Sequence, residues 1–267
     1  MTQQPVPIII TGAAGRMGAT LCTLVTDAPT LYTLVGVTDK PEMLPSLKKW
    51  GVPISDDLNS LLDRIVPSVP DLVSIDFTSP EASLNHARIS AKHGSGLVIG
   101  TTGLSTEQMG ELRALAVKTT LFWAPNMSVG VNVMLRILPD LVRLLGESYD
   151  LEIMEIHHNR KKDAPSGTAL AIANVLANAR KWKLDEVARC QREGIVGERP
   201  QKEIGVQALR GGDVAGIHTV YCLGPGERIE VTHQAHSRDN FASGALRAAA
   251  WIHKKEPGKL YSMEDFL

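Results

Sequence analysis

The start of the chain limits the fold most, because a strand-like run passes through a glycine-rich loop into a helix-like run. PIIIT at 7–11 is apolar and β-branched, which is typical of a buried parallel strand. GAAGRMG at 12–18 follows, MGATLCTLVTDA at 17–28 has helical character, and LYTLVGVTD at 31–39 is strand-like again. This order predicts a unit of two parallel strands joined by a helix.

The same alternation continues to about residue 125. Further strands are expected at LVSIDF, GLVIG and TLFWAP, with one helix from Pro80 to Gly94 and another near 105–117. Proline suits the first turn of a helix and glycine its end, so the first of these helices is bounded on both sides. The pattern predicts a Rossmann-like, doubly wound parallel sheet of the α/β class.

The pattern changes after Asn126, which indicates a second domain. Helices are expected at 128–147 and 166–181, with a strand at 149–158 between them, whereas 183–203 is polar and weakly patterned. The stretch 206–237 contains strand-like runs separated by glycine-rich turns, which is typical of a mixed or antiparallel sheet. A last helix, FASGALRAAAWIHKK, is expected to return to the first domain. We therefore predict one domain formed by 1–128 and 239–267, and a smaller α+β domain at 129–238.

Composition excludes several classes of function. The formal net charge is −1, from 28 Lys and Arg against 29 Asp and Glu, which argues against broad binding of nucleic acid or an anionic membrane. No run of about 18 apolar residues occurs, so no membrane span is expected. Cys22, Cys190 and Cys222 are scattered and odd in number, so we expect no disulfide framework and no metal site. These features favour a reduced, cytoplasmic protein.

The glycine loop predicts a dinucleotide site. Gly12, Gly15 and Gly18 lie between a strand and a helix, although the second glycine is displaced by one from the usual G-x-G-x-x-G order. They would allow a tight turn, close approach of the backbone to a pyrophosphate, and close packing of helix on strand. The helix start offers N–H groups to the anion, and Arg16 adds a cation.

Two residues after the second strand bear on the choice of cofactor. Asp39 lies about 20 residues beyond the loop, where an acid accepts hydrogen bonds from the adenosine ribose and favours NADH. Lys40 could instead pair with the 2′-phosphate of NADPH, so binding of both is expected. Asp39 also fits a plain turn before Pro41. GTTG at 100–103 follows another strand at the same edge of the sheet. It would be either a ligand-binding loop or an ordinary turn.

The segment EIHHNRKKDAPSGTAL at 155–170 predicts a site for a small anion. His157 and His158 would face opposite ways in a regular strand, so either one points elsewhere or the strand breaks there. Ser166 is a candidate N-cap, and the N–H groups of Gly167 and Thr168 would then be open to a carboxylate or phosphate. Basic side chains and a helix start fit a small dicarboxylate, and histidine exchanges protons near neutral pH. A solvated charged loop ahead of a capped helix is the alternative.

Several long motifs together resemble the dihydrodipicolinate reductase family, also called 4-hydroxy-tetrahydrodipicolinate reductases. The resemblance covers nearly the whole chain. The motif at 155–169, here called the histidine–lysine block, is more specific than the glycine loop. The motifs are GAAGRMG at 12–18, DFTSPE at 76–81, GTTGL at 100–104, APNMSVGVNV at 124–133, EIHHNRKKDAPSGTA at 155–169, RGGDVAGIHTV at 210–220 and HSRDNFASGALRAAAWI at 236–252.

The resemblance implies an activity and a set of sites. It implies that 1–128 and 239–267 form the dinucleotide-binding domain and that 129–238 forms the domain for substrate binding and oligomerisation. The chain would be a homotetramer that reduces 4-hydroxy-tetrahydrodipicolinate to tetrahydrodipicolinate with NADH or NADPH, in lysine and diaminopimelate biosynthesis. His157 and Lys161 match the family's proton-transfer pair, and the substrate carboxylates would contact His158, Gly167 and Thr168. The cofactor would be held by Gly12, Ala13, Ala14, Gly15, Arg16, Met17, Asp39, Lys40, Gly100, Thr101, Thr102, Ala124, Pro125, Asn126 and Met127.

Other functions remain open from the residues. A two-domain dehydrogenase acting on aspartate or an amino sugar would share the glycine loop but not the histidine–lysine block. A non-catalytic dinucleotide sensor would need no proton donor beside an anion site. A metalloenzyme is disfavoured because His157 and His158 are adjacent rather than four apart. Acyl transfer by a cysteine has no histidine near it in sequence.

Overall fold

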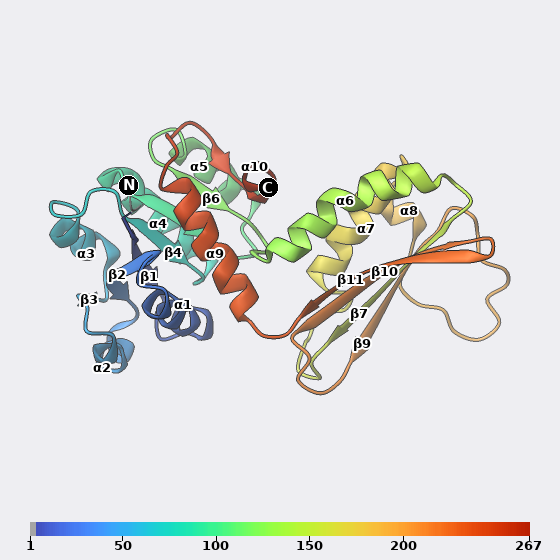
Figure 1. Cartoon of the computed structure of the whole chain (residues 1–267), viewed down its shortest axis with the longest axis horizontal. Coiled ribbons are helices and arrows are strands. Elements are labelled where there is room, and N and C mark those ends of the chain that lie inside the picture. Colours follow the sequence, from blue (N-terminus) through green and yellow to red (C-terminus); the bar gives the residue numbers. More distant parts are fainter. Residues whose placement is uncertain (1–3) are drawn as a thin grey trace. The chain divides into compact units, whose positions relative to one another are not determined.

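A computed structural model describes residues 4–267, which form two compact units (Figure 1). The first unit runs to Ser128 and takes up the chain again at Arg238–Leu267, and the second unit is Val129–Ser237. No helix in the described part of the chain is long and apolar enough to cross a membrane.

The first unit contains a seven-stranded sheet in which every pair of neighbouring strands is parallel. The strand order is β12-β6-β5-β4-β1-β2-β3, so the chain changes direction across the sheet between β1 and β4. This confirms the predicted Rossmann-like, doubly wound fold. The strands are β1 (Val6–Thr11), β2 (Tyr32–Thr38), β3 (Ile54–Ser55), β4 (Val73–Asp76), β5 (Gly96–Ile99), β6 (Leu121–Trp123) and β12 (Leu260–Tyr261).

Helices cover both faces of this sheet. Ile8 and Ile10 of β1 pack in one core with α1 (Arg16–Asp27) and α9 (Asp239–Ile252). Ile9 points to the opposite face and packs with α3 (Leu58–Ile65). Because both faces are buried, β1 has to be apolar at successive positions rather than at alternate ones. The opposite face also holds α4 (Pro80–His93) and α5 (Thr106–Leu115), and the short helices are α2 (Leu44–Leu47) and α10 (Met263–Phe266).

The ends of α4 follow the expected signals. Ser79 is the N-cap and accepts a hydrogen bond from the N–H of Ala82, Pro80 occupies the first turn, and Gly94 ends the helix with φ +68°. The sequence pattern predicts no element between residues 40 and 71, yet α2, β3 and α3 lie there. Asp57 caps α3 by accepting the N–H of Ser60 at 2.8 Å.

The second unit contains a five-stranded mixed sheet in the order β11-β10-β7-β9-β8. The β7–β9 and β8–β9 pairs are parallel, whereas β7–β10 and β10–β11 are antiparallel, which confirms the predicted mixed sheet. Two long helices, α6 (Val129–Leu145) and α7 (Gly167–Ala179), lie over one face (Figure 1). The other elements are β7 (Asp150–His157), α8 (Leu184–Val187), β8 (Ala188–Arg189), β9 (Ile204–Arg210), β10 (Gly216–Gly224) and β11 (Glu227–Ala235).

Strand β7 places polar groups at one end of the buried face. Leu151, Ile153, Glu155 and His157 alternate with more exposed residues and are all buried. The first two join the apolar core below α6 and α7. Since side chains of a strand alternate between faces, Glu155 and His157 continue that same face beyond the apolar core.

Candidate functional site

In the loop after β1, the neighbouring atoms leave no room for a side chain at the first and third of the three glycines. Gly12 has φ +63°, and a Cβ there would lie 2.9 Å from Cγ2 of Thr78. A Cβ on Gly18 would lie 2.1 Å from the carbonyl oxygen of Gly12. Gly15 is the exposed N-cap of α1, and no side chain caps the first-turn N–H groups. The loop therefore offers a helix start that suits a phosphate.

Asp39 ties the glycine loop to the end of β2. Its Oδ2 accepts the N–H of Ala14 at 2.7 Å, and its Oδ1 accepts the N–H of Lys40 at 2.8 Å. The N–H of Ala13 donates to the carbonyl of Thr38 at 3.0 Å. Arg16 and Lys40 are exposed and Met17 is half-buried, so both cations at this end of the sheet face outward.

A buried carboxylate, Asp76, organises the loop after β5. It accepts hydrogen bonds from both the N–H and the hydroxyl of Thr78, from Ser83 and from Thr101, and it pairs with His86. Burial acts to raise the pKa of Asp76, but its hydrogen bond with His86 and the further donors outweigh this and lower it. The carboxylate thus holds β4, α4 and the start of the GTTG loop together.

The remaining predicted cofactor residues follow β5 and β6. Gly100 donates its N–H to the carbonyl of Asp76 at 2.8 Å, and a Cβ there would lie 2.1 Å from the ring of Phe77. The indole N–H of Trp123 donates to the carbonyl of Thr101 at 3.1 Å. Thr101, Ala124 and Met127 are buried, whereas Thr102 and Pro125 are exposed and Asn126 is half-buried. All fifteen predicted cofactor residues lie within or beside the loops that follow β1, β2, β5 and β6, at one edge of a parallel sheet.

His157, the last residue of β7, is 9 % exposed. Its Nδ1 lies 2.6 Å from Oε2 of Glu155, and its ring meets that of His218 edge-on at 5.1 Å between centroids. Burial lowers the pKa of His157, the charges of Lys161 and Arg210 add to this, and the bond to Glu155 opposes it. The imidazole is therefore mostly neutral near pH 7. A proton on Nδ1, which faces the Glu155 carboxylate, would leave Nε2 able to accept one.

The strand ends at His157, which resolves the question raised by two adjacent histidines. His158 is half-buried beyond the strand, and its N–H donates to the carbonyl of Val214 at 2.8 Å. A turn follows in which the N–H of Lys161 donates to the carbonyl of His158 at 3.1 Å. The ammonium of Lys161 lies 2.9 Å from Asp163 and is largely shielded, with 20 % of its side chain exposed. This turn keeps Lys161 next to His158, and near enough to His157 for its charge to lower the pKa of that ring.

At the start of α7, a buried side chain caps the helix while the next residue is exposed to solvent. Ser166 is buried, and its Oγ accepts the N–H of Ala169 at 3.1 Å, which makes it the N-cap that the sequence predicts. Gly167 is exposed, and a Cβ there would meet nothing within 4 Å. Thr168 is half-buried beside it. The helix start therefore offers room and positive potential to an anion.

Three residues of this region carry no role in the sequence prediction. Glu155 is fully buried between His157 and Arg210, and His218 lies opposite Glu155 on the neighbouring strand β10. Glu155 could be found from the spacing alone, since it lies two residues before His157 on the same face of a strand. Arg210 and His218 come from other strands, and only the pairing of the strands brings them to the site.

Comparisons with known proteins agree over nearly the whole chain. Two family models match, described as dihydrodipicolinate reductase N-terminus over residues 6–127 and C-terminus over residues 130–267. The 4-hydroxy-tetrahydrodipicolinate reductase of Nitratidesulfovibrio vulgaris is 61 % identical over 97 % of this chain and 98 % of its own, and that of Lawsonia intracellularis is 50 % identical over the same shares.

One solved structure supports the fold. The dipicolinate-bound dihydrodipicolinate reductase from Paenisporosarcina sp. TG-14 covers 98 % of this chain and 100 % of its own, with a TM-score of 0.75 and 24 % identity. Sequence and fold thus agree, and this chain belongs to the dihydrodipicolinate reductase family.

Proposed function

We propose that this protein reduces 4-hydroxy-tetrahydrodipicolinate to tetrahydrodipicolinate with NADH or NADPH, in lysine and diaminopimelate biosynthesis. Its membership of the reductase family supports this reaction. The observation that carries the proposal is the end of β7, where a buried neutral histidine, a shielded ammonium and an open helix start lie within one short segment, His157–Thr168. A dinucleotide sensor would have no use for this combination.

The first unit would hold the cofactor. The backbone around Gly12–Met17 suits the pyrophosphate because side chains are absent where the loop turns and where α1 begins. Asp39 and Lys40 would meet the adenosine end, and the loops at Gly100–Thr102 and Ala124–Met127 the nicotinamide end. Exposed Lys40 beside Asp39 favours use of both cofactors. When bound, the reduced nicotinamide would supply hydride to an unsaturated ring carbon of the substrate, whose 4-hydroxyl group leaves as water.

The second unit would hold the substrate by its carboxylates. The N–H groups of Gly167 and Thr168 at the start of α7 suit one carboxylate, and His158 lies in the same segment to receive a charged group. Fixing a small dianion in this way makes the later proton transfer effectively intramolecular. A small dicarboxylate is thus the substrate class that these residues favour.

Lys161 would be the proton donor, and His157 would assist it. Because the pKa of His157 is lowered, its ring is mostly neutral near pH 7 and is not the main source of the proton that the substrate receives. Lys161 would give one ammonium proton to the substrate as hydride adds to it, and Nε2 of His157 would take a proton from solvent and pass it to the amine that is left. The pair can therefore deliver a proton to the reduced substrate and be reloaded from solvent.

The assembly and the location are part of this proposal. We expect a homotetramer built on the sheet face of the second unit that carries no helix among the described residues. We place the enzyme in the cytoplasm, where its three cysteines would stay reduced; all three are free in the structure, and Cys22 and Cys222 are buried.

Oxidation of NADH and NADPH, followed by absorbance, tests the reaction. The substrate would be formed in place from pyruvate and aspartate semialdehyde by the preceding synthase. Lys161→Ala should lower turnover by about 10²–10⁴, because it removes a positioned proton donor, while the Kd for NADH stays unchanged. Its matched control is Lys162→Ala, which removes the neighbouring exposed lysine and should behave as wild type.

Two results would contradict the proposal. Normal turnover in Lys161→Ala would remove that residue from the chemistry. Binding of NADH without any oxidation by the wild-type protein would favour a sensor or a different substrate.

A further inference from the structure

Glu155 lies at the centre of a buried polar cluster in the second unit. The Glu155 cluster comprises Glu155, His157, Ser166, Arg210 and His218. The carboxylate has no exposed surface, although a buried carboxylate is costly unless its oxygens are fully hydrogen-bonded. Something must therefore compensate its charge, and the groups that do so identify its role.

Three elements donate to this one carboxylate. Arg210, at the end of β9, places its two terminal nitrogens 2.7 and 2.8 Å from the two oxygens. The N–H of Ser166, directly before α7, donates to Oε1 at 3.0 Å. Nδ1 of His157 lies 2.6 Å from Oε2. Arg210 also donates to the carbonyl of Asp163, so the same guanidinium holds the turn that carries Lys161.

The charge on Glu155 is secured by these donors. Burial acts to raise its pKa, but the hydrogen bonds from Arg210, His157 and Ser166 outweigh burial and lower it. Because an ionised carboxylate only accepts hydrogen bonds, the nitrogen of His157 that faces it must carry a proton. The other nitrogen, Nε2, is then left as an acceptor and makes no hydrogen bond with any residue from 4 to 267.

The helix start is joined to the same anchor by a second contact. Ser166 Oγ lies 3.0 Å from Nε2 of His218, and the rings of His218 and His157 pack edge to face. The cap of α7 and the ring of His157 thus touch the same two side chains, Glu155 and His218. A shift of the carboxylate would move both.

We propose that Glu155, held by Arg210, is a positioning residue that keeps His157 in its Nδ1–H form and fixes that ring to the start of α7. The inference rests on the proposed role of His157 and adds the group that orients it. It means that the proton-transfer nitrogen and the carboxylate-binding helix start share one anchor. Glu155 itself is buried and does not meet substrate.

Glu155→Gln tests the proposal, because glutamine keeps the shape and removes the charge. The amide can donate to Nδ1 as well as accept from it, so the Nδ1–H form of His157 should no longer be enforced. Nitrogen-15 spectra of the histidine rings in the free protein should show part of His157 protonated on Nε2, the signal being assigned by its loss in His157→Gln. The kcat should fall on the order of 10²-fold, with the Kd for NADH unchanged.

Glu152→Gln is the matched control. Glu152 lies on the same strand, is largely buried and is paired with two arginines, Arg192 and Arg199, but it faces away from His157. This variant should leave the His157 spectrum and the kcat as in wild type. Glu155→Asp provides a second test should the glutamine variant not fold, because it retains the charge but retracts it from the ring, and its kcat should fall less.

The outcomes separate this inference from the proposed reaction. An unchanged His157 spectrum in Glu155→Gln, or an equal loss of kcat in Glu152→Gln, would overturn the positioning role while leaving the reductase intact. A shifted spectrum in a protein that never oxidises NADH with this substrate would support the positioning role and overturn the proposed reaction.

Discussion

Individual glycines of the first unit differ in what their surroundings allow. At Gly18 a methyl group would meet the backbone of Gly12 and Ala13, at 2.1 and 2.7 Å, which cannot move without opening the loop. At Gly110, in the exposed part of α5, it would meet nothing within 4 Å.

Gly18→Ala should therefore lower the free energy of unfolding by roughly 1–3 kcal/mol and weaken NADH binding. Gly110→Ala should leave binding unchanged and raise the free energy of unfolding by up to about 1 kcal/mol, because alanine is the better helix former. Urea denaturation and NADH fluorescence titration measure both. Equal effects of the two substitutions would show that the loop does not have the close packing described.

His218 should make the second unit sensitive to acid. Burial lowers the pKa of His218 from 6.5 to about 4, with the nearby charge of His157 adding to this. Below pH 6.5, His218 binds a proton in the unfolded chain, whereas in the folded protein it binds one only near pH 4. The free energy of unfolding therefore falls across this window. His218→Gln should remove roughly 3 kcal/mol of that fall. Denaturation at pH 7 and pH 4.5 checks it, and an unchanged pH dependence would refute it.

The local pattern predicts the residues of the β7–α7 segment but not the side chains that hold them. His157, Lys161 and the cap at Ser166 lie within ten residues, and that spacing predicts a small-anion site, whereas the proton-transfer roles of His157 and Lys161 come from the family resemblance. Arg210 reaches Glu155 because β9 runs parallel beside β7, with Arg210 paired to His157. No local signal gives this register, since it depends on how strands far apart in sequence pair. The roles of the predicted site residues stay predictions until the variants are measured.

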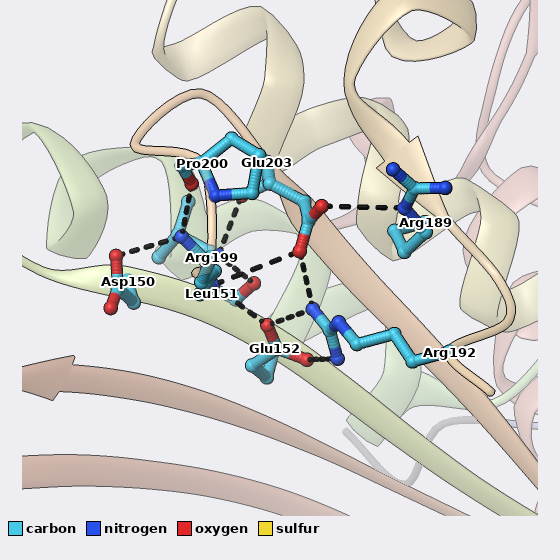
Figure 2. Close-up of polar contacts among 8 residues, drawn as sticks. All are labelled: Asp150, Leu151, Glu152, Arg189, Arg192, Arg199, Pro200 and Glu203. Atoms are coloured by element: carbon cyan, nitrogen blue, oxygen red, sulfur yellow. Dashed lines mark hydrogen bonds and ion pairs between the residues drawn. The ribbon is translucent and has the colours of Figure 1, made fainter. Parts of the chain in front are cut away.

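At the scale of elements, an ionic network fastens the polar segment before β9. Arg199 contacts Asp150 and Glu152 of β7 and donates to three backbone carbonyls, while Arg192 pairs with Glu152 and Glu203 (Figure 2). Glu203 is only 5 % exposed. A segment that is weakly patterned in sequence is thus ordered by charge pairs rather than by apolar burial.

Arg199→Ala should loosen this segment without unfolding the unit. It removes hydrogen bonds to charged groups, each worth about 1.5–3 kcal/mol, so amide exchange over residues 190–202 should become about 10- to 100-fold faster. Exchange mass spectrometry measures this, with Arg189→Ala as a control because its side chain is 57 % exposed and makes one long contact. Equal exchange in wild type and Arg199→Ala would mean that the network does not hold the segment.

Elements with a strong period are predicted well, and the errors have identifiable causes. The long helices and central strands appear within a few residues of their expected positions. The central strands of the first sheet are easy to predict because both faces of that sheet are buried, which requires apolar runs. The interval before β4 is missed although Leu58, Leu61, Leu62 and Ile65 have helical spacing and all are buried. The two-residue strands β3, β8 and β12 carry too few residues to show any period.

At the scale of the whole molecule, the residues predicted for cofactor binding and those predicted for proton transfer lie in separate units. All predicted cofactor residues lie in the unit with the parallel sheet, and all predicted proton-transfer and substrate residues lie in Val129–Ser237. Each unit has its own apolar core. Substitutions at His157 or Lys161 should therefore change turnover without changing the affinity for NADH. Substitutions in the glycine loop should change the affinity for NADH without changing turnover.

The second sheet also bears on assembly. One face of it packs against α6 and α7, whereas within residues 4–267 no helix packs against the other. That uncovered face carries neighbouring apolar side chains from three paired strands: Ile156, Ile217 and Leu209. Leu209 is 44 % exposed and the other two are half-buried. Apolar side chains in a row on an open sheet face are typical of a surface that pairs with another chain.

Ile156→Asp should therefore break the expected homotetramer. An aspartate would place an uncompensated charge in the buried interface, which is far more costly than the same charge in solvent. Sedimentation velocity should show wild type at the mass of four chains and the variant at a lower mass. Leu144→Asp is the control, since Leu144 is an 87 % exposed apolar residue on α6 and its replacement should leave the tetramer intact. A monomeric wild type would refute the assembly, and a tetrameric Ile156→Asp would place the interface elsewhere.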